Sequence, residues 1–214
     1  KLFGVARNIS TLQQGRSSGA PMLANQPTLV DMTKAALNVL DDDEDGFAVM
    51  IEGGAVDWAG HANQLDRIIE EQIDFNNAVQ AVVDYLDNNT NGNNWGNTLL
   101  IVTADHETGY LWGDGTGSFF DVNGNGIFDD GIDYAHITDK GVNTLPGGKF
   151  YSGDHSNSLV PLFAKGARSE RFNRCMLGKA KHLRAIYNLD DSWSGKYIDN
   201  TCVYEVMKNA SLNE

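Results

Sequence analysis

Residues 47–61, FAVMIEGGAVDWAGH, pass from an apolar run through two glycines into a segment with helical spacing. The apolar residues 47–51 predict a short strand that is buried on both faces. Glu52 stands just past the carboxyl end of that strand, where ligands collect in open α/β sheets. The predicted fold class depends on this stretch, because it contains a buried strand that leads directly into a helix.

The segments on either side of residues 47–61 continue the alternation of helices and strands. The spacing of apolar residues predicts helices over 27–40, about 60–86 and 179–187, and strands over 1–6, 98–103 and 159–164. This order predicts an α/β fold with a mostly parallel central sheet flanked by helices. Because the chain opens inside a strand, we expect residues 1–214 to be an incomplete domain. The glycine-rich stretch at about 112–150 reads as an insertion loop.

The composition limits the classes of partner that the chain can bind. A formal net charge of −13 repels nucleic-acid backbones, so we expect no nucleic-acid binding platform. No apolar run approaches the roughly 18 residues that a membrane-spanning helix needs. An anionic substrate remains compatible with this charge, because bound divalent cations can reverse the sign of the potential inside a cleft.

Two cysteines, Cys175 and Cys202, flank the C-terminal region. They are not spaced as C-x-x-C, which argues against a thiolate zinc site. Either they form a disulfide in an exported protein, or they are two unrelated buried thiols. We favour the disulfide, because it would secure the C-terminal tail.

Three constellations in the sequence carry candidate metal ligands. Asp57 and His61 are four residues apart, which places both side chains on one face of a helix. Alternatively, Asp57 stabilises a helix N-terminus and His61 is solvated. Asp105 and His106 form a second pair, at the end of the strand predicted over 98–103, and His155 precedes the strand at 159–164.

The donor types in these constellations decide which ions they favour. Oxygen and nitrogen donors without sulfur suit zinc, and carboxylates alone suit magnesium. His155 is either a loop histidine without a role or the residue that completes a site of two histidines and one carboxylate. His136 and His182 have no such surroundings, and we interpret them as surface histidines.

The insertion loop contains a possible calcium site. Residues 121–131, DVNGNGIFDDG, place oxygen side chains at alternate positions and then add two carboxylates. The pattern is similar to an EF-hand-like calcium loop, although Ile132 stands where that motif has glutamate. A turn-rich loop without an ion explains the composition equally well. The candidate ligands are Asp121, Asn123, Asn125, Asp129 and Asp130.

Three motifs occur in a fixed order along the chain. They are Glu-Gly-Gly-x-x-Asp-x-x-x-His at 52–61, a strand that ends Thr-Ala-Asp-His at 103–106, and Gly-Asp-His at 153–155 before an apolar run. In order, spacing and strand context they resemble the alkaline phosphatase family, over most of residues 1–165. The resemblance is to the C-terminal, metal-ligand portion of one alkaline-phosphatase-like domain, which residues 1–214 would form.

The resemblance implies a role for each motif residue. Asp57, His61 and His155 would hold one zinc, and Asp105 and His106 would hold a second. Glu52 would bind a third ion, magnesium. Trp58 would tune that third site. The implied reaction is hydrolysis of phosphate monoesters through a phosphoserine, in a homodimer with a periplasmic or extracellular location.

The family's nucleophile segment and its phosphate-binding arginine have no counterpart in this sequence. We therefore expect the nucleophile to come from a missing N-terminal half, and the chain to be inactive alone. A phosphodiesterase or phosphomutase of the same superfamily is the nearest alternative, because such enzymes share the metal framework. A non-catalytic metal-binding fragment is the other.

Overall fold

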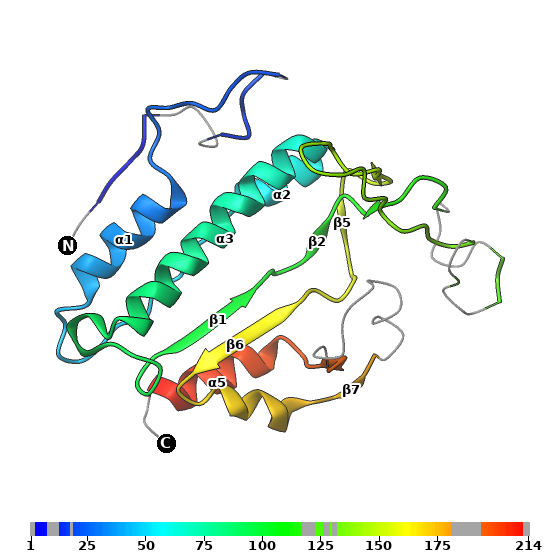
Figure 1. Cartoon of the computed structure of the whole chain (residues 1–214). Helices are drawn as coiled ribbons and strands as arrows, with labels where there is room; N and C mark the ends of the chain where they lie inside the picture. Colours follow the sequence, from blue (N-terminus) through cyan, green and yellow to red (C-terminus); the bar gives the residue numbers. More distant parts are fainter. Residues whose placement is uncertain are drawn as a thin grey trace.

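The computed structural model describes residues 3–7, 13–17, 19–116, 123–125, 129, 132–180 and 194–211. Its helices are α1 (Leu29–Leu40), α2 (Ala55–His61), α3 (Leu65–Asp87) and α5 (Thr201–Ser211), with 3-10 helices η1 (Thr90–Gly92) and η2 (Ser169–Cys175). The strands are β1 (Leu99–Thr103), β2 (Glu107–Thr108), β3 (Leu111–Trp112), β4 (Lys149–Phe150), β5 (His155–Ser156), β6 (Leu162–Gly166), β7 (Gly178–Lys179) and β8 (Lys196–Tyr197). Figure 1 shows α1 and α3 side by side, with the β1–β6 ribbon between them and α5.

Helix α1 confirms the helix predicted over 27–40 and begins with a capping box. The Thr28 hydroxyl accepts a hydrogen bond from the Asp31 amide, and the Asp31 carboxylate accepts one from the Thr28 amide. These bonds satisfy amides that the first helical turn leaves without partners. Hydrogen bonds from the backbone and the side chain of Thr28 lower the pKa of Asp31.

The buried stripe of α1 differs from the predicted one. In the sequence, the apolar residues that predict this helix by sharing one face are Leu29, Met32, Ala36, Val39 and Leu40. The structure instead buries Leu29, Thr33 and Leu37, while Met32 and Val39 are exposed. More than one set of residues in α1 satisfies the helical period. The packing of α1 against α3 determines which set is buried.

The helix predicted over about 60–86 is divided into α2 and α3. The break falls at Asn63, whose φ of 54° is left-handed and cannot continue a right-handed helix. Hydrogen bonds from the Asn63 amide to the Gly60 carbonyl and from the Gln64 amide to the Ala59 carbonyl close the turn. The break places Asp57 and His61 together on the short helix α2, at one end of α3 (Figure 1).

The strands of the described residues pair only antiparallel, as β1–β6, β2–β5, β3–β4 and β7–β8. The structure is therefore α/β, but a mostly parallel central sheet is not shown. In the longest pair, Leu99 lies opposite Gly166 and Thr103 lies opposite Leu162. β6 starts later than predicted, after Pro161, because proline has no amide to donate to a strand pair.

Two predicted strands are absent from the described part of the chain. Residues 47–51 are not assigned to a strand, and neither are residues 3–6 of the predicted first strand. Met50 is 85% exposed, so residues 47–51 are not buried as predicted, and Phe3 in the first stretch is 91% exposed. A strand requires backbone hydrogen bonds to a neighbour, and within the described residues none of the paired strands includes these stretches.

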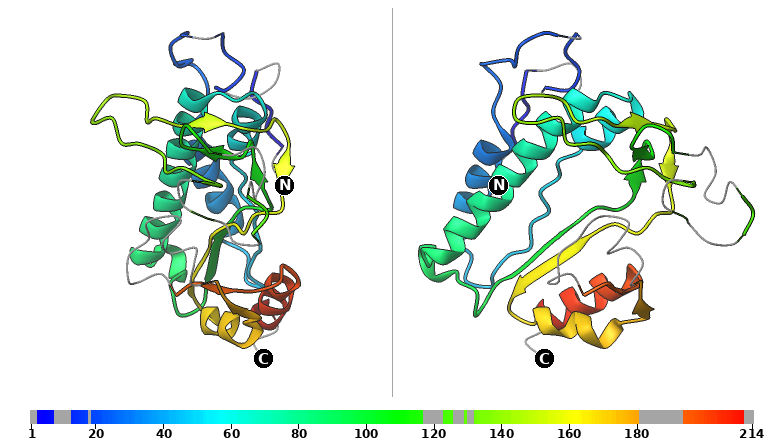
Figure 2. Two further views of the ribbon diagram at one scale, coloured as in Figure 1. Left: turned by 90° about the vertical axis from the view of Figure 1, so that its right-hand side faces the viewer. Right: turned by 45° about the vertical axis from the view of Figure 1, so that its right-hand side comes forward.

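The predicted insertion loop has a short pair of strands, β3 and β4, at its base. Tyr110, just before β3, forms a small aromatic core with Trp112 of β3 and Tyr134 of the loop, and Tyr151, just after β4, packs against it. Figure 2 shows some of the described, coloured parts of this segment extending beyond the helices. The loop thus has a local core that its sequence pattern does not reveal.

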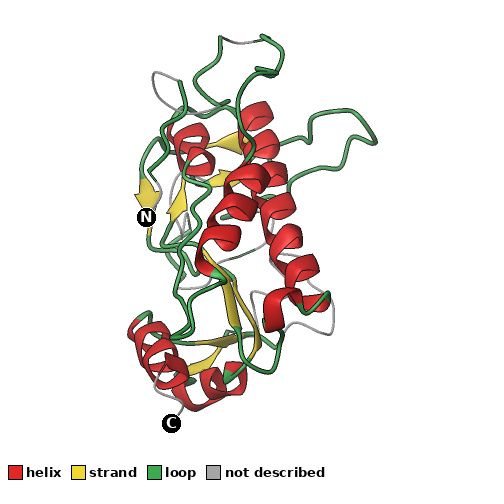
Figure 3. Ribbon diagram, turned by 90° about the vertical axis from the view of Figure 1, so that its left-hand side faces the viewer, coloured by secondary structure: helices red, strands yellow, loops and turns green. Residues whose placement is uncertain are grey.

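The C-terminal region is joined by a disulfide between Cys175, at the end of η2, and Cys202, in α5. Figure 3 shows η2 and α5 together at one end of the molecule. Of the helix predicted over 179–187, residues 181–187 lie outside the described residues, and Lys179 belongs to strand β7. Among the described residues, helices long and apolar enough to cross a membrane are absent.

Candidate metal centre

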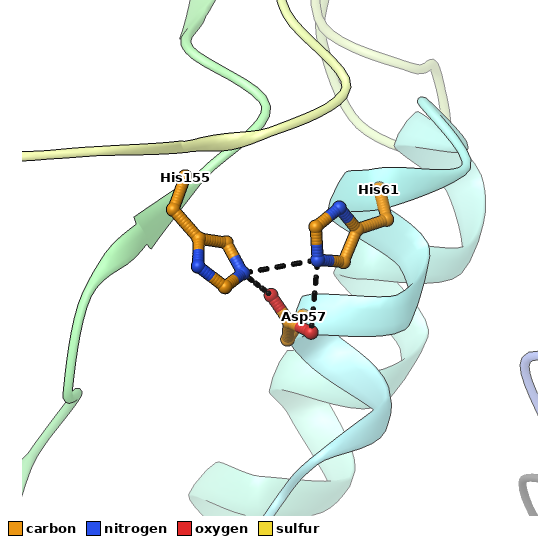
Figure 4. A group of neighbouring side chains, drawn as sticks. All are labelled: Asp57, His61 and His155. Carbon is orange, nitrogen blue, oxygen red and sulfur yellow. Dashed lines mark hydrogen bonds and ion pairs between the residues drawn. The ribbon is translucent and has the colours of Figure 1, made fainter.

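Helix α2 and strand β5 bring Asp57, His61 and His155 together (Figure 4). One helical turn separates Asp57 from His61, and the His61 Nε2 lies 3.5 Å from the Asp57 Oδ2. His155 approaches from β5, with its Nε2 3.3 Å from the Asp57 Oδ1 and 3.0 Å from the His61 Nε2. Three potential ligand atoms from two distant segments therefore face a common point.

The imidazole of His61 is held in a defined orientation. Its Nδ1 lies 2.6 Å from the carbonyl oxygen of Gly153, and a carbonyl can only accept a hydrogen bond. The Nδ1 therefore carries the hydrogen and donates it. The lone pair of Nε2 is left to face Asp57 and His155, as a metal ligand requires.

The dimensions of the cluster fit a zinc ion. Zinc binds imidazole nitrogen and carboxylate oxygen at about 2.0–2.1 Å, so tetrahedral ligand atoms lie about 3.3–3.4 Å apart. The separations of 3.0, 3.3 and 3.5 Å in the cluster lie close to that value. Each Asp57 oxygen faces a different imidazole, which permits binding through one or both oxygens.

Strand β5 fixes the position of His155 through its pairing with β2. In this pair His155 lies opposite Thr108, and Ser156 lies opposite Glu107. The side chains of His61 and His155 remain 40% and 46% exposed, and that of Asp57 remains 35% exposed. A cluster this open to solvent leaves room for a further ligand beside the three protein groups.

Asp105 and His106 lie beside the cluster. The ring of His106 stacks on that of His155, with 3.5 Å between the centroids and 23° between the planes. The His106 Nε2 lies 3.3 Å from the Asp105 Oδ2, and the Asp105 side chain is 89% exposed. The second predicted ligand pair is therefore adjacent to the first.

The remaining predicted residues are not members of the group formed by Asp57, His61 and His155. Glu52 is exposed, and its Oε1 lies 3.2 Å from where a Cβ on Gly54 would stand, at the start of α2. Trp58 is 57% exposed, one residue beyond Asp57. His136 is exposed and packs edge-on against Tyr134, consistent with a surface histidine. His182 lies outside the described residues.

Sequence reasoning missed Thr108 and Glu107. The Thr108 hydroxyl lies 2.5 Å from the Asp57 Oδ1 and 3.2 Å from the His106 Nδ1. The Glu107 carboxylate accepts hydrogen bonds from the Tyr110 amide and from the Ser156 hydroxyl, which joins β2 to β5. Their position directly after the predicted ligand His106 was the available signal in the sequence.

The candidate calcium loop is only partly described. Asn123 and Asn125 direct their side-chain amide nitrogens to the Asp129 Oδ2, at 3.3 and 2.7 Å. The Asp129 amide donates to the Asp133 Oδ2 at 2.6 Å. Asp121 and Asp130, the other two predicted ligands, lie outside the described residues.

Comparisons with known proteins place the chain among alkaline phosphatases. It is 41% identical over 83 residues to alkaline phosphatase 3 of Bacillus subtilis (strain 168), covering 39% of this chain and 17% of the relative. It is 39% identical over 80 residues to the alkaline phosphatase of Escherichia coli (strain K12), covering 37% of this chain and 16% of the relative. The matched segment is thus a small part of each relative.

The solved alkaline phosphatase from the Antarctic bacterium TAB5 is 32% identical, with a TM-score of 0.48, and the match covers 71% of this chain and 40% of that one. A variant of the same enzyme, 33% identical, is described as having Mg bound.

The family model described as alkaline phosphatase matches residues 17–131. That range includes Glu52, Asp57, His61, Asp105 and His106, and the fold brings His155 to the same place from outside it. Since the matched range spans more than half of the 214 residues, the chain belongs to the alkaline phosphatase family.

Proposed function

We propose that this chain is the metal-binding portion of a phosphate monoesterase, an alkaline phosphatase. The observation that carries the proposal is the convergence of Asp57, His61 and His155 from α2 and β5. These residues would hold one zinc, and Asp105 and His106 would hold a second beside it. Glu52 would contribute to a magnesium site, with Trp58 as its neighbour.

The metal ions would supply Lewis-acid chemistry. When bound, they polarise phosphoryl oxygens and make a bound water more acidic. The residues of this chain fix where that chemistry occurs. The Gly153 carbonyl orients His61, the pairing of β2 with β5 places His155, and the stacked rings of His155 and His106 bring the two proposed sites side by side.

The nucleophile and the group that clamps the phosphate would come from a further segment. Two observations support this part of the proposal. The matched segments cover only 16–17% of the two curated relatives. The stretch that leads into the site also leaves Met50 85% exposed, and Phe163 on β6 is 57% exposed. Such apolar surface is typical of a face that another segment covers.

We also propose, as parts of the same function, that the phosphoryl group is transferred through a serine and that the protein is a homodimer. Its proposed location is periplasmic or extracellular. The disulfide between Cys175 and Cys202 supports export, because disulfides persist in oxidising compartments.

We also propose calcium as the ion of the loop around Asn123, Asn125 and Asp129, where oxygen-bearing side chains gather.

Complementation tests the proposed reaction. The chain is co-expressed with the N-terminal half of an alkaline phosphatase relative, and hydrolysis of 4-nitrophenyl phosphate is measured with zinc and magnesium. We expect turnover that is lost in His61→Ala and retained in His136→Ala. Turnover that survives His61→Ala would contradict the proposal, and cleavage confined to a phosphodiester would favour the phosphodiesterase alternative.

A further inference from the structure

Thr108 lies between the two groups of candidate ligands. It belongs to β2, opposite His155, and its Oγ1 contacts both the Asp57 Oδ1 and the His106 Nδ1. Asp57 comes from the first group and His106 from the second. A single hydroxyl thus joins two side chains that the proposed function assigns to different ions.

The chemistry of the three groups fixes the direction of both hydrogen bonds. An ionised carboxylate can only accept, and a threonine hydroxyl has one hydrogen to donate. At 2.5 Å that hydrogen goes to the Asp57 Oδ1. The hydroxyl can then only accept from His106, so the His106 Nδ1 must carry a hydrogen. The lone pair of the His106 Nε2 is left on the side of Asp105, 3.3 Å from its Oδ2.

Close packing between α2 and β2 makes this bridge possible. Gly60 is buried on α2, and a Cβ at that position would lie 3.1 Å from both the Cβ and the Cγ2 of Thr108. It would also lie 3.2 Å from the Thr108 carbonyl oxygen. With glycine at 60, the helix approaches the strand closely enough for the Thr108 hydroxyl to reach Asp57.

We propose that Thr108 is a positioning residue that couples the two metal sites, an inference that rests on the proposed function. Its hydroxyl orients the Asp57 carboxylate toward one ion and sets the tautomer of His106 for the other. Removing the hydroxyl should therefore weaken zinc binding at both sites. Outer partners of metal ligands typically contribute about 10–100-fold in affinity, and we expect a loss in that range.

Zinc titration against a chromophoric chelator tests the coupling in the 214-residue chain. Thr108→Val is nearly isosteric and lacks the hydroxyl, while Thr108→Ser keeps it. Thr98→Val is the matched control, because the Thr98 hydroxyl bonds to Asn97, away from the cluster. We expect weaker binding in Thr108→Val, recovery in Thr108→Ser and no change in Thr98→Val.

Nitrogen NMR of the imidazole side chains gives a readout that needs neither metal nor activity. In the metal-free chain at about pH 8.5, where unperturbed imidazoles are neutral, His106 should carry its hydrogen on Nδ1. Thr108→Val should shift it toward a mixture of tautomers. A His106 hydrogen on Nε2 in the unsubstituted chain would overturn the inference, even if Thr108→Val failed to fold.

The outcomes separate the two proposals. If the unsubstituted chain binds zinc and Thr108→Val binds it equally well, the coupling role is wrong while the metal centre stands. If the unsubstituted chain binds no zinc, the proposed function itself fails. Weaker binding in Thr108→Ser to the same extent as in Thr108→Val would also overturn the inference, because the hydroxyl would then not be the cause.

Discussion

The Nε2 atoms of His61 and His155 lie 3.0 Å apart, each beside a different oxygen of Asp57. Two neutral imidazoles that approach through their lone pairs repel each other unless a proton or a cation lies between them. Since Gly153 holds the hydrogen of His61 on Nδ1, the Nε2 of His61 is an acceptor. The contact is therefore bridged either by a hydrogen on the His155 Nε2 or by a cation that both nitrogens bind.

Glu71 on α3 should make stability depend on pH. Its side chain is buried, its Oε1 has no hydrogen-bond partner among the described residues, and desolvation raises its pKa. A carboxyl whose pKa is raised in the folded state binds more protons there than in the unfolded state. Stability should therefore fall as pH rises from about 4.5, the unperturbed value, through the folded pKa.

Glu71→Gln removes the titrating group and should flatten this dependence. We expect its Tm to exceed that of the unsubstituted chain at neutral pH, with the difference shrinking toward pH 4.5. Thermal unfolding at several pH values, followed by circular dichroism, measures it. A parallel pH dependence in the two proteins would contradict this account of Glu71.

The disulfide between Cys175 and Cys202 should leave no free thiol. Labelling of the unreduced, unfolded protein should therefore detect none. The link spans 27 residues, and replacing both cysteines by serine should lower the free energy of unfolding by about 3 kcal/mol. Two labelled cysteines per chain would show that the link is not formed in solution, and a double variant as stable as the unsubstituted chain would contradict the expected contribution to stability.

Calcium should protect the loop around Asn123, Asn125 and Asp129 from proteolysis. Bound calcium would draw oxygen atoms toward one point, and the ordered loop would be cleaved more slowly. Limited proteolysis with and without calcium measures the effect, and Asp129→Asn should reduce it. Equal cleavage rates between residues 112 and 150 in both conditions would count against calcium.

The chain alone should not hydrolyse phosphate monoesters. The proposed reaction needs a nucleophile, and we assign that group to a further segment. We expect no turnover of 4-nitrophenyl phosphate by the purified chain, even with zinc and magnesium present. Robust turnover that is lost on changing His61 or Asp105 would show that the nucleophile lies within these 214 residues.

The candidate site could be found from sequence because its pattern is local. Asp57 and His61 are one helical turn apart, and this spacing holds whatever the helix packs against. Asp105 and His106 directly follow a strand that was predicted nearly to the residue. The contribution of His155 depends on the pairing of β2 with β5. For His155, the only signal in the sequence was the order of the three motifs, which resembles that of the alkaline phosphatase family.

The pairing of the strands could not be predicted, because it depends on neighbours. Residues 47–51 have the composition of a buried strand, but Met50 is exposed and the stretch is unpaired in the described chain. The division between α2 and α3 depends on the left-handed Asn63, a conformation that asparagine adopts often but not always. The Thr108 bridge follows from the contact of α2 with β2, which no local pattern encodes.

Zinc titration of the 214-residue chain tests the central claim most directly. Zinc affinity is measured by competition with a chromophoric chelator for the unsubstituted chain, His61→Ala, His155→Ala and the matched control His136→Ala. If Asp57, His61 and His155 form the metal centre, His61→Ala and His155→Ala should each weaken binding by more than about 100-fold, beyond the range of outer partners. His136→Ala should bind as the unsubstituted chain does. Equal zinc affinity in all four proteins would contradict the assignment of the metal centre.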